Sequence, residues 1–265
     1  MDEKIGLVAG KGKLPELILR ELLKRNIDVY TIALKGFGSS ELVSLSFEGK
    51  VLKIGDVGKI LAFFKERGIK KLIMAGKVEH TNIFKDFSAD LKAFSLLKEL
   101  KNKNTLSIYS LISDFLKKNG ISLLDYDWLL KDYIPSKGVL VGKIGKKAMD
   151  FLNNGFSTAK KIAELDIGQA ISFKDGVVIG VEAVEGTDEM IRRSGTLVKD
   201  FFVIKVSNPH QSLSFDMPVV GKDTLKNIYE SGGKGLVIEA GKTIVLDLED
   251  CMEYAKRQKL ILVAL

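Results

Sequence analysis

Short apolar runs alternate with amphipathic stretches through the first half of the chain, and this alternation constrains the fold more than any other feature. Residues 5–9 form an apolar run that ends in a glycine turn, and Pro15 then suits the first turn of a helix because it lacks an N–H. The runs that we predict as strands cover residues 5–9, 29–34, 51–54, 71–75 and 121–125. Strands that alternate with helices imply a parallel sheet with helices on both faces.

The helices predicted between these strands each have one apolar face. They cover residues 14–23, 59–67 with Gly68 as C-cap, 91–100 and 106–118. The helical pattern stops near residues 133–138, where proline and glycine lie close together. We therefore expect a Rossmann-like N-terminal domain over residues 1–137 and a C-terminal α+β catalytic domain over residues 138–265, with the ligand bound between them.

The second half is richer in predicted strands, so the fold class as a whole is α/β. A long helix is expected over residues 146–165, and Asp175-Gly176 is a strong hairpin signal. The predicted strands cover residues 169–173, 177–184, 201–206, 235–239 and 243–247. Two shorter helices are predicted over residues 222–231 and 247–258.

The composition is that of a globular protein. Of 265 residues, 46% are hydrophobic and 28% are charged, which argues against disorder. No apolar run approaches the ~18 residues of a membrane span, and the N-terminus leads into a strand without a signal peptide, so we expect a cytoplasmic location. The single cysteine, Cys251, excludes an internal disulfide and a multi-cysteine metal site.

The net charge of +7 raises the question of an anionic partner. Basic residues are not interleaved with aromatic ones and no nucleic-acid motif is present, so we expect no nucleic-acid partner. An anionic membrane surface is the better candidate, because basic groups near lipid headgroups gain about 1 kcal/mol per charge. A solvated, lysine-rich surface without a partner is the alternative.

The glycine turn over residues 10–15 occupies the place where a dinucleotide-binding fold has G-x-G-x-x-G. Here the third glycine is Pro15, and the acid expected at the end of the second strand is replaced by Leu34-Lys35-Gly36. Both departures disfavour a dehydrogenase. Gly10 and Gly12 still let backbone N–H groups approach a phosphate, and a tight turn without a ligand is the alternative. With only His80 and His210 as histidines, a zinc site is not expected.

The segment Val181–Arg193 combines four carboxylates, a glycine turn and an arginine pair. Thr187 is predicted as the N-cap of a helix, and a helix N-terminus attracts anions. The carboxylates would repel a bare phosphate, but Mg²⁺ bound by a few carboxylates and substrate phosphates reconciles the two. In the alternative interpretation, Asp188 and Glu189 complement the helix dipole, and Arg192 and Arg193 pair with them.

Six segments together carry a resemblance to a known family. They are Gly6–Pro15, Met74–Val78, Asp166–Ala170, Val181–Arg193, Phe215–Gly221 followed by Thr224, and Gly235–Gly241. In this order and spacing they resemble the motifs of the LpxI-type UDP-2,3-diacylglucosamine pyrophosphatases of lipid A biosynthesis. The resemblance implies a hydrolase that cleaves the pyrophosphate bond of UDP-2,3-diacylglucosamine, giving UMP and 2,3-diacylglucosamine 1-phosphate (lipid X).

The resemblance also implies roles for particular residues. Asp216 is expected to be catalytic, and Asp216, Asp188 and Glu185 are expected to bind Mg²⁺ or another divalent cation such as Mn²⁺. The residues expected to bind the substrate are Gly10, Gly12, Gly76, Lys77, Gln169, Glu182, Glu185, Gly186, Thr187, Asp188, Arg192, Gln211 and Thr224. We further expect a homodimer at the inner face of the inner membrane.

One segment departs from the family pattern. Asn208, Ser212 and Ser214 stand where the family has a lysine, an aspartate and an arginine, so Asp216 is the only carboxylate there. The residues that could supply compensating positive charge are Lys205, Lys222 and His210. The loss of charge keeps a non-catalytic lipid or nucleotide-sugar binding protein open as an alternative, beside a nucleotide-sugar oxidoreductase.

Overall fold

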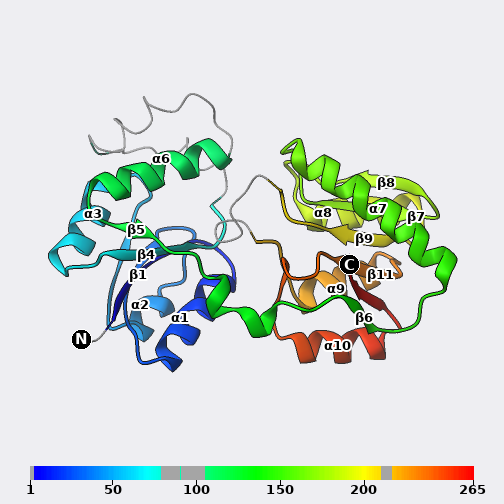
Figure 1. Ribbon diagram of the computed structural model, residues 1–265, viewed down its shortest axis with the longest axis horizontal. Coiled ribbons are helices and arrows are strands. Elements are labelled where there is room, and N and C mark those ends of the chain that lie inside the picture. Colours follow the sequence, from blue (N-terminus) through cyan, green and yellow to red (C-terminus); the bar gives the residue numbers. More distant parts are fainter. Residues whose placement is uncertain (1–2, 79–89, 91–104, 210–216) are drawn as a thin grey trace. The chain divides into compact units, whose positions relative to one another are not determined.

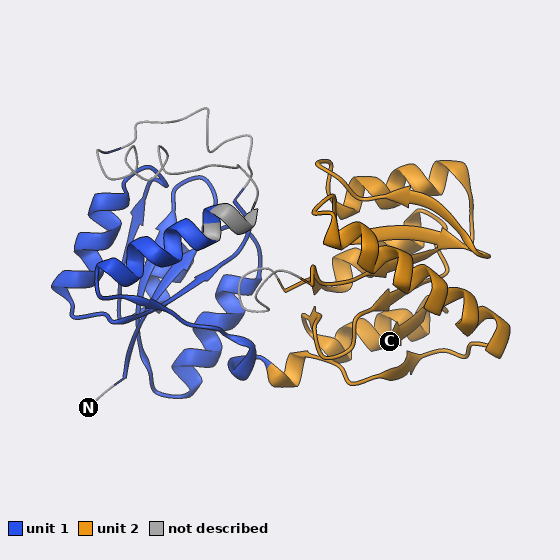
Figure 2. Ribbon diagram, turned by 45° about the horizontal axis from the view of Figure 1, so that its top comes forward, with its two compact units in different colours: residues 1–130 blue, residues 131–265 orange. Residues whose placement is uncertain are grey.

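The computed structural model describes residues 3–78, 90, 105–209 and 217–265. The chain divides into two compact units, Met1–Leu130 and Lys131–Leu265 (Figure 2). The proline–glycine segment over residues 133–138, at which the sequence predicts a domain boundary, lies inside the C-terminal unit. No helix in the described parts of the chain combines the length and apolar character needed to cross a membrane.

The N-terminal unit contains a five-stranded sheet with the order β3-β2-β1-β4-β5, in which every pair of strands is parallel. Its strands are β1 (Lys4–Ala9), β2 (Asp28–Leu34), β3 (Glu48–Leu52), β4 (Lys71–Ala75) and β5 (Ser122–Leu123). The predicted parallel sheet is thereby confirmed. The strand order reverses between β1 and β4, the kind of position where open α/β sheets bind ligands.

Helices cover both faces of this sheet (Figure 1). They are α1 (Leu14–Lys24), α2 (Glu41–Leu45), α3 (Val57–Glu66) and α6 (Thr105–Lys118), and two 3-10 turns follow at Asp127–Leu129 and Lys131–Tyr133. Phe64 of α3 and Leu116 of α6 share a core with Ile32 and Leu72 of the sheet, whereas α1 buries Ile18 on the other face. The helix predicted over residues 91–100 lies outside the described residues.

The C-terminal unit contains a mixed six-stranded sheet with the order β6-β13-β11-β9-β7-β8. These strands are β6 (Gly138–Val141), β7 (Ala170–Lys174), β8 (Val177–Val181), β9 (Phe202–Lys205), β11 (Gly235–Ile238) and β13 (Ile261–Ala264). Strands β9, β11 and β13 are parallel, and the others join antiparallel. Two short strands, β10 (Val219–Val220) and β12 (Ile244–Val245), form a separate parallel pair. The predicted α+β character of this half is confirmed.

Four helices enclose the second sheet. They are α7 (Lys146–Glu164), α8 (Thr187–Leu197), α9 (Lys222–Glu230) and α10 (Leu248–Arg257). Ala159 of α7 belongs to the core on one face, with Phe202 and Ile204. The helices α8, α9 and α10 share the core of the opposite face, which includes Val203. Because side chains alternate along a strand, Lys205 at the end of β9 points to the face covered by α8.

The strand pairing gathers several chain ends at one edge of this sheet. Lys205 lies opposite Ala170 and Ile238, and Val181 lies opposite Ile171. The residues that follow β8, β9 and β11 therefore meet the residue that precedes β7. We call this place the carboxyl edge, and its polar members are Gln169, Glu182, Lys205, Ser207, Asn208 and Glu239. The predicted Asp175-Gly176 hairpin joins β7 and β8, with both turn residues at positive φ.

Candidate active site

At the carboxyl edge, the Thr187 hydroxyl links a buried lysine, Lys205, to the carboxylate of Glu182 by hydrogen bonds. Thr187 Oγ1 donates to Glu182 Oε1 at 2.6 Å and accepts from Lys205 Nζ at 3.1 Å. The second carboxylate oxygen, Glu182 Oε2, accepts from the backbone N–H of Gln169 at 3.2 Å. Lys205 is only 8% exposed. The structure thus brings together Gln169, Glu182 and Thr187 of the predicted substrate-binding set, and adds Lys205.

The cap of α8 differs from the prediction. Gly186 is the N-cap residue and Thr187 is the first residue of the helix, so the prediction of Thr187 as N-cap is wrong. Gly186 has a φ of +84°, which an L side chain rarely adopts. The Thr187 hydroxyl is consequently directed to Glu182 rather than to a backbone N–H of its own helix.

The remaining carboxylates and the arginines of residues 181–193 are bonded to other residues of the chain. Glu185 pairs with Arg193 at 2.9 Å, and Arg192 pairs with Glu189. Asp188 accepts a hydrogen bond from Asn227 at 3.1 Å. The pairing of arginines with acids is therefore present, although Arg193 reaches Glu185 rather than the acids of its own helix. The pKa of Glu185 is lowered, first by its own backbone N–H and then by Arg193.

The described residues offer no ready cage for a metal ion. Among them, no group of three or more His, Cys, Asp or Glu side chains lies close enough to bind one. Glu185 and Asp188, two of the three predicted ligands, instead bond to Arg193 and Asn227. The third predicted ligand, Asp216, lies outside the described residues.

A second polar network, on the α7 side of the carboxyl edge, centres on Glu239. Its Oε2 accepts from Ser207 N at 2.8 Å, Ser207 Oγ at 2.9 Å and Lys160 Nζ at 3.0 Å. Its Oε1 accepts from Lys160 at 3.1 Å and pairs with Lys242 at 3.0 Å. No role was predicted for Glu239, although a carboxylate at the end of a predicted apolar strand is a usable signal.

The electrostatics of Glu239 follow from these contacts. Burial is the largest single effect and by itself raises the pKa of its carboxyl, since the residue is 6% exposed. The N–H of Ser207 and the ammonium groups of Lys160 and Lys242 favour the charged form and together outweigh burial, so the pKa is lowered. Glu239 is therefore a carboxylate at neutral pH.

The predicted catalytic residue Asp216 and the predicted substrate-binding residue Gln211 lie outside the described residues, as do His80, His210, Ser212 and Ser214. The chain that follows Asp216 is described. Pro218 O accepts from Ile244 N at 2.9 Å, and Val219 O lies 3.5 Å from Lys205 Nζ. Val219, three residues after Asp216, therefore lies beside Lys205.

Predicted substrate-binding residues of the N-terminal unit lie at its strand-order reversal. Lys11 and Lys77 exchange backbone hydrogen bonds at 2.9 Å, which joins the loop after β1 to the loop after β4. A Cβ on Gly10 would lie 2.8 Å from Lys77 O, and one on Gly76 would lie 2.8 Å from the Gly10 carbonyl carbon. Close packing of the two loops thus accounts for Gly10 and Gly76. Gly12 faces open space, which leaves room for a ligand.

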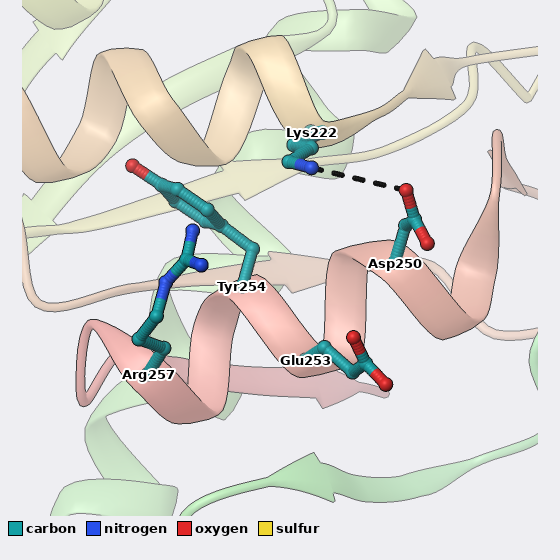
Figure 3. Close-up of a pocket in the computed structure, with 5 residues that line it drawn as sticks. All are labelled: Lys222, Asp250, Glu253, Tyr254 and Arg257. Carbon is teal, nitrogen blue, oxygen red and sulfur yellow. Dashed lines mark ion pairs between the residues drawn. The ribbon is translucent and has the colours of Figure 1, made fainter.

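A cavity of about 310 Å³ lies elsewhere, between α9 and α10 (Figure 3). It is lined by Lys222, Asp250, Glu253, Tyr254 and Arg257. Lys222 Nζ lies 3.8 Å from Asp250, and the Arg257 guanidinium lies over the Tyr254 ring. Of the lysines considered as substitutes for the missing family charges, Lys205 is at the carboxyl edge and Lys222 is at this cavity. Thr224 lies in the first turn of α9, where its N–H bonds to Gly221 O.

Comparison with known proteins identifies related chains. The family model described as the LpxI N-terminal domain matches residues 4–133, and that described as the LpxI C-terminal domain matches residues 136–263. The chain is also similar to the "UDP-2,3-diacylglucosamine pyrophosphatase LpxI" of Caulobacter vibrioides. The two are 28% identical over 263 residues, which cover 93% of this chain and 91% of the relative.

Solved structures show only a distant likeness. The biotin carboxylase subunit of pyruvate carboxylase gives a TM-score of 0.30 at 13% identity, and the match covers 70% of this chain and 39% of that one. Glycinamide-RNase-transformylase T from Mycobacterium tuberculosis gives a TM-score of 0.27 at 10% identity, covering 68% and 44%. The chain spans less than half the length of either protein, and likenesses at this level carry no functional argument.

Proposed function

The chain belongs to the LpxI family, and from this premise we propose that it hydrolyses the pyrophosphate bond of UDP-2,3-diacylglucosamine to UMP and 2,3-diacylglucosamine 1-phosphate. The observation that carries the proposal is the match to both family domains, over residues 4–133 and 136–263. The name of the Caulobacter vibrioides relative supports the substrate. The reaction belongs to lipid A biosynthesis.

The carboxyl edge supplies groups suited to this chemistry. The Lys205 ammonium is buried and is held by the Thr187 hydroxyl at 3.1 Å, at the first turn of α8. Hydrolysis of a phosphoanhydride is catalysed mainly by positioning and by stabilising negative charge on phosphate oxygens. In our proposal Lys205 and the free N–H groups of α8 stabilise that charge. Asp216 orients the attacking water, whose proton is released to solvent.

We propose that Mg²⁺ or Mn²⁺ assists the reaction, with Asp216 as the protein ligand. Such an ion would neutralise phosphate oxygens of the substrate. A site made of one carboxylate and substrate phosphates is common for Mg²⁺ and does not require a preformed cage. Hydrolysis after treatment with a chelator, and after addition of either cation, tests the dependence.

The test of the function is turnover by the purified chain. Incubation with UDP-2,3-diacylglucosamine should release UMP and the acylated sugar phosphate in equal amounts, as identified by mass spectrometry. UDP-glucosamine without acyl chains is the matched control substrate and should react more slowly. A folded protein that forms no UMP with Mg²⁺ or Mn²⁺ would refute the proposal.

One observation favours a second candidate, a non-catalytic binding protein. Asn208, which stands where the family has a lysine, is buried and its amide lies 3.3 Å from Asp166 Oδ1. It therefore presents no positive charge to a phosphate. Retention of intact UDP-2,3-diacylglucosamine by the protein, without formation of UMP, would favour this candidate.

A further inference from the structure

We propose that β3 (Glu48–Leu52) is the surface through which two copies of this chain associate, by antiparallel pairing of β3 with β3 of a second copy. The strand lies at the edge of the N-terminal sheet, and among the described residues no strand pairs with its outer side. A free edge presents N–H and C=O groups to which another strand can bond. The inference is independent of the proposed function.

The backbone groups on the outer side of β3 follow from its pairing with β2. The carbonyl oxygen of Leu52 accepts from Lys35 N at 2.8 Å, so the backbone groups of Leu52 are directed toward β2. Because this direction alternates along a strand, the backbone groups of Gly49 and Val51 are directed outward. A second strand can therefore bond to Gly49 and Val51 without breaking a bond to β2.

The charges of β3 favour one register of this pairing. When two copies pair antiparallel about Gly49, Glu48 of each copy lies opposite Lys50 of the other copy. Opposite charges at such positions stabilise a pair of strands, whereas like charges destabilise it. Moving the centre by one residue places Glu48 opposite Glu48, or Lys50 opposite Lys50. The strand is thus complementary to itself in the register centred on Gly49.

Both charged side chains lie on the face of β3 that α3 covers. Glu48 pairs with Arg67 at the end of α3, and Lys50 Nζ lies 5.7 Å from the centre of the Phe63 ring. Lys50 is exposed, and the side chain of Glu48 is 42% exposed. Each can therefore meet the opposite charge of a second copy while keeping its contact within the chain.

Exposed apolar side chains flank the same strand. Phe47, directly before β3, is 65% exposed, and Val51 is 45% exposed. In the pairing about Gly49, Phe47 of each copy lies in register with Val51 of the other copy. Association therefore removes apolar surface from water on both sides of the charged pairs, which favours the dimer.

The other edge strands of the two large sheets are protected from such pairing. Strand β5 has only two residues, and the pairings of β6 and β8 with their neighbours contain register shifts. Short edges and bulges hinder the association of sheet edges. At β8 the Arg193 side chain also donates to Val181 O at 3.1 Å. Strand β3, in contrast, keeps an uninterrupted register with β2 over five residues.

The test is the mass of the full chain in solution, measured by analytical ultracentrifugation over a range of concentrations. Paired strands of five residues make a small interface, so we expect monomers and dimers in exchange. Lys50→Glu places like charges opposite each other at two symmetric positions and should weaken dimerisation about 10-fold or more. Lys146→Glu, at an exposed lysine of α7, changes the net charge equally and should leave dimerisation unchanged.

Two results of this experiment would overturn the proposal. A wild type that stays monomeric would mean that Lys50 protects the edge, as lysines on edge strands commonly do. A Lys50→Glu protein that dimerises as strongly as the wild type would place the dimer contact on another surface.

Mixing two variants tests the register itself. Glu48→Lys alone should also stay monomeric, because two pairs of lysines then face each other. An equimolar mixture of Lys50→Glu and Glu48→Lys restores opposite charges at both positions and should form a heterodimer. Two folded variants that do not associate on mixing would overturn the pairing about Gly49.

A further variant covers the case in which Glu48→Lys, which loses its pair with Arg67, does not fold. Val51→Pro removes an outward N–H and leaves the groups that bond to β2 in place. We expect a monomer whose melting temperature is near that of the wild type. Dimerisation of Val51→Pro at wild-type strength would count against the role of this edge.

Discussion

The charged residues of the candidate site differ in the partners to which they are already bonded within the chain. Glu185, Asp188 and Arg192 are bonded to Arg193, Asn227 and Glu189. A ligand would have to compete with these partners. Lys205 is buried beside the first turn of α8, where its ammonium donates to the Thr187 hydroxyl and where helix N–H groups also favour an anion. We therefore assign the principal phosphate contact to Lys205 rather than to Arg192.

The first prediction concerns Asp216. Asp216→Ala should lower kcat by about 10² or more, which corresponds to about 2.7 kcal/mol. Its melting temperature should remain near that of the wild type, because the role that we propose for Asp216 is chemical rather than structural. Asp150→Ala, an exposed acid on α7, is the control. Activity above about a third of wild type would transfer the catalytic role to another acid.

The second prediction separates two lysines. Lys205→Met should lower kcat/KM by about 10-fold or more, because a charge-assisted hydrogen bond to a phosphate is worth about 1.5–3 kcal/mol. Lys222→Met, at the cavity between α9 and α10, should leave kcat/KM unchanged. Steady-state kinetics of the two variants checks this. Equal effects would remove Lys205 from the site.

The third prediction uses the lowered pKa of Glu239. A carboxyl whose pKa is lower in the folded state stabilises the fold above its ordinary value of 4.5 and loses this contribution as pH falls through the folded value. The free energy of unfolding of the wild type should therefore exceed that of Glu239→Gln at pH 7 by about 1–3 kcal/mol. The difference should shrink below pH 4.5. Denaturant unfolding at several pH values measures it, and a pH-independent difference would contradict the account.

At the scale of helices and strands, apolar and buried elements were predictable from the sequence. The strand predicted over residues 71–75 is β4, and the helix predicted over residues 146–165 is α7 (Lys146–Glu164). The strand predicted over residues 51–54 lies earlier in the chain, as β3 (Glu48–Leu52). It is a partly exposed edge strand without an apolar run, so hydrophobicity alone does not give its bounds. Strand β13 (Ile261–Ala264) was missed, since periodicity alone does not separate a short apolar run from the preceding helix.

The candidate site was predictable only where its members lie close in sequence. Glu182 and Thr187 belong to one motif, and their hydrogen bond is local. The contact of Lys160 with Glu239 depends on the packing of α7 across the sheet. No spacing in the sequence encodes that contact, and for this reason the Glu239 network was not foreseen.

The fourth prediction concerns the two joined loops of the N-terminal sheet. Gly10→Ala should destabilise the protein by about 1–3 kcal/mol, because its Cβ would lie 2.8 Å from the backbone oxygen of Lys77 and neither loop can yield freely. Gly145→Ala is the control, because its Cβ would meet open space at the N-cap of α7, and it should destabilise the protein by less than Gly10→Ala, at most about 1 kcal/mol. Thermal unfolding compares the two. Equal melting temperatures would show that the loops separate easily.

At the scale of the whole molecule, the family membership and the net charge indicate where in the cell the protein is expected to act. The matches to the two LpxI domains fall on the two units, one on each. The net charge of +7 and an acylated substrate together suggest work at a lipid surface. We propose that the protein binds the inner face of the inner membrane peripherally and forms a homodimer, whose mass light scattering would measure.

The fifth prediction tests the membrane proposal. The purified protein should sediment with vesicles that contain anionic lipid at low salt, and should be released at high salt, because screening shortens the reach of its positive charge. Vesicles of neutral lipid are the control and should bind less. Absence of binding at low salt, or binding that salt does not change, would contradict an electrostatic association.

The anchoring of the chain at both Ser207 and Val219 has an evolutionary consequence. Because the stretch Glu239–Val245 contacts both Ser207 and Val219, we expect the sequence between these two residues to diverge among relatives more readily than the two contacts themselves. The replacement of family charges by Asn208, Ser212 and Ser214 is a change of this kind. Grafting the corresponding segment of a relative onto these two anchors would offer a direct route to altering substrate preference.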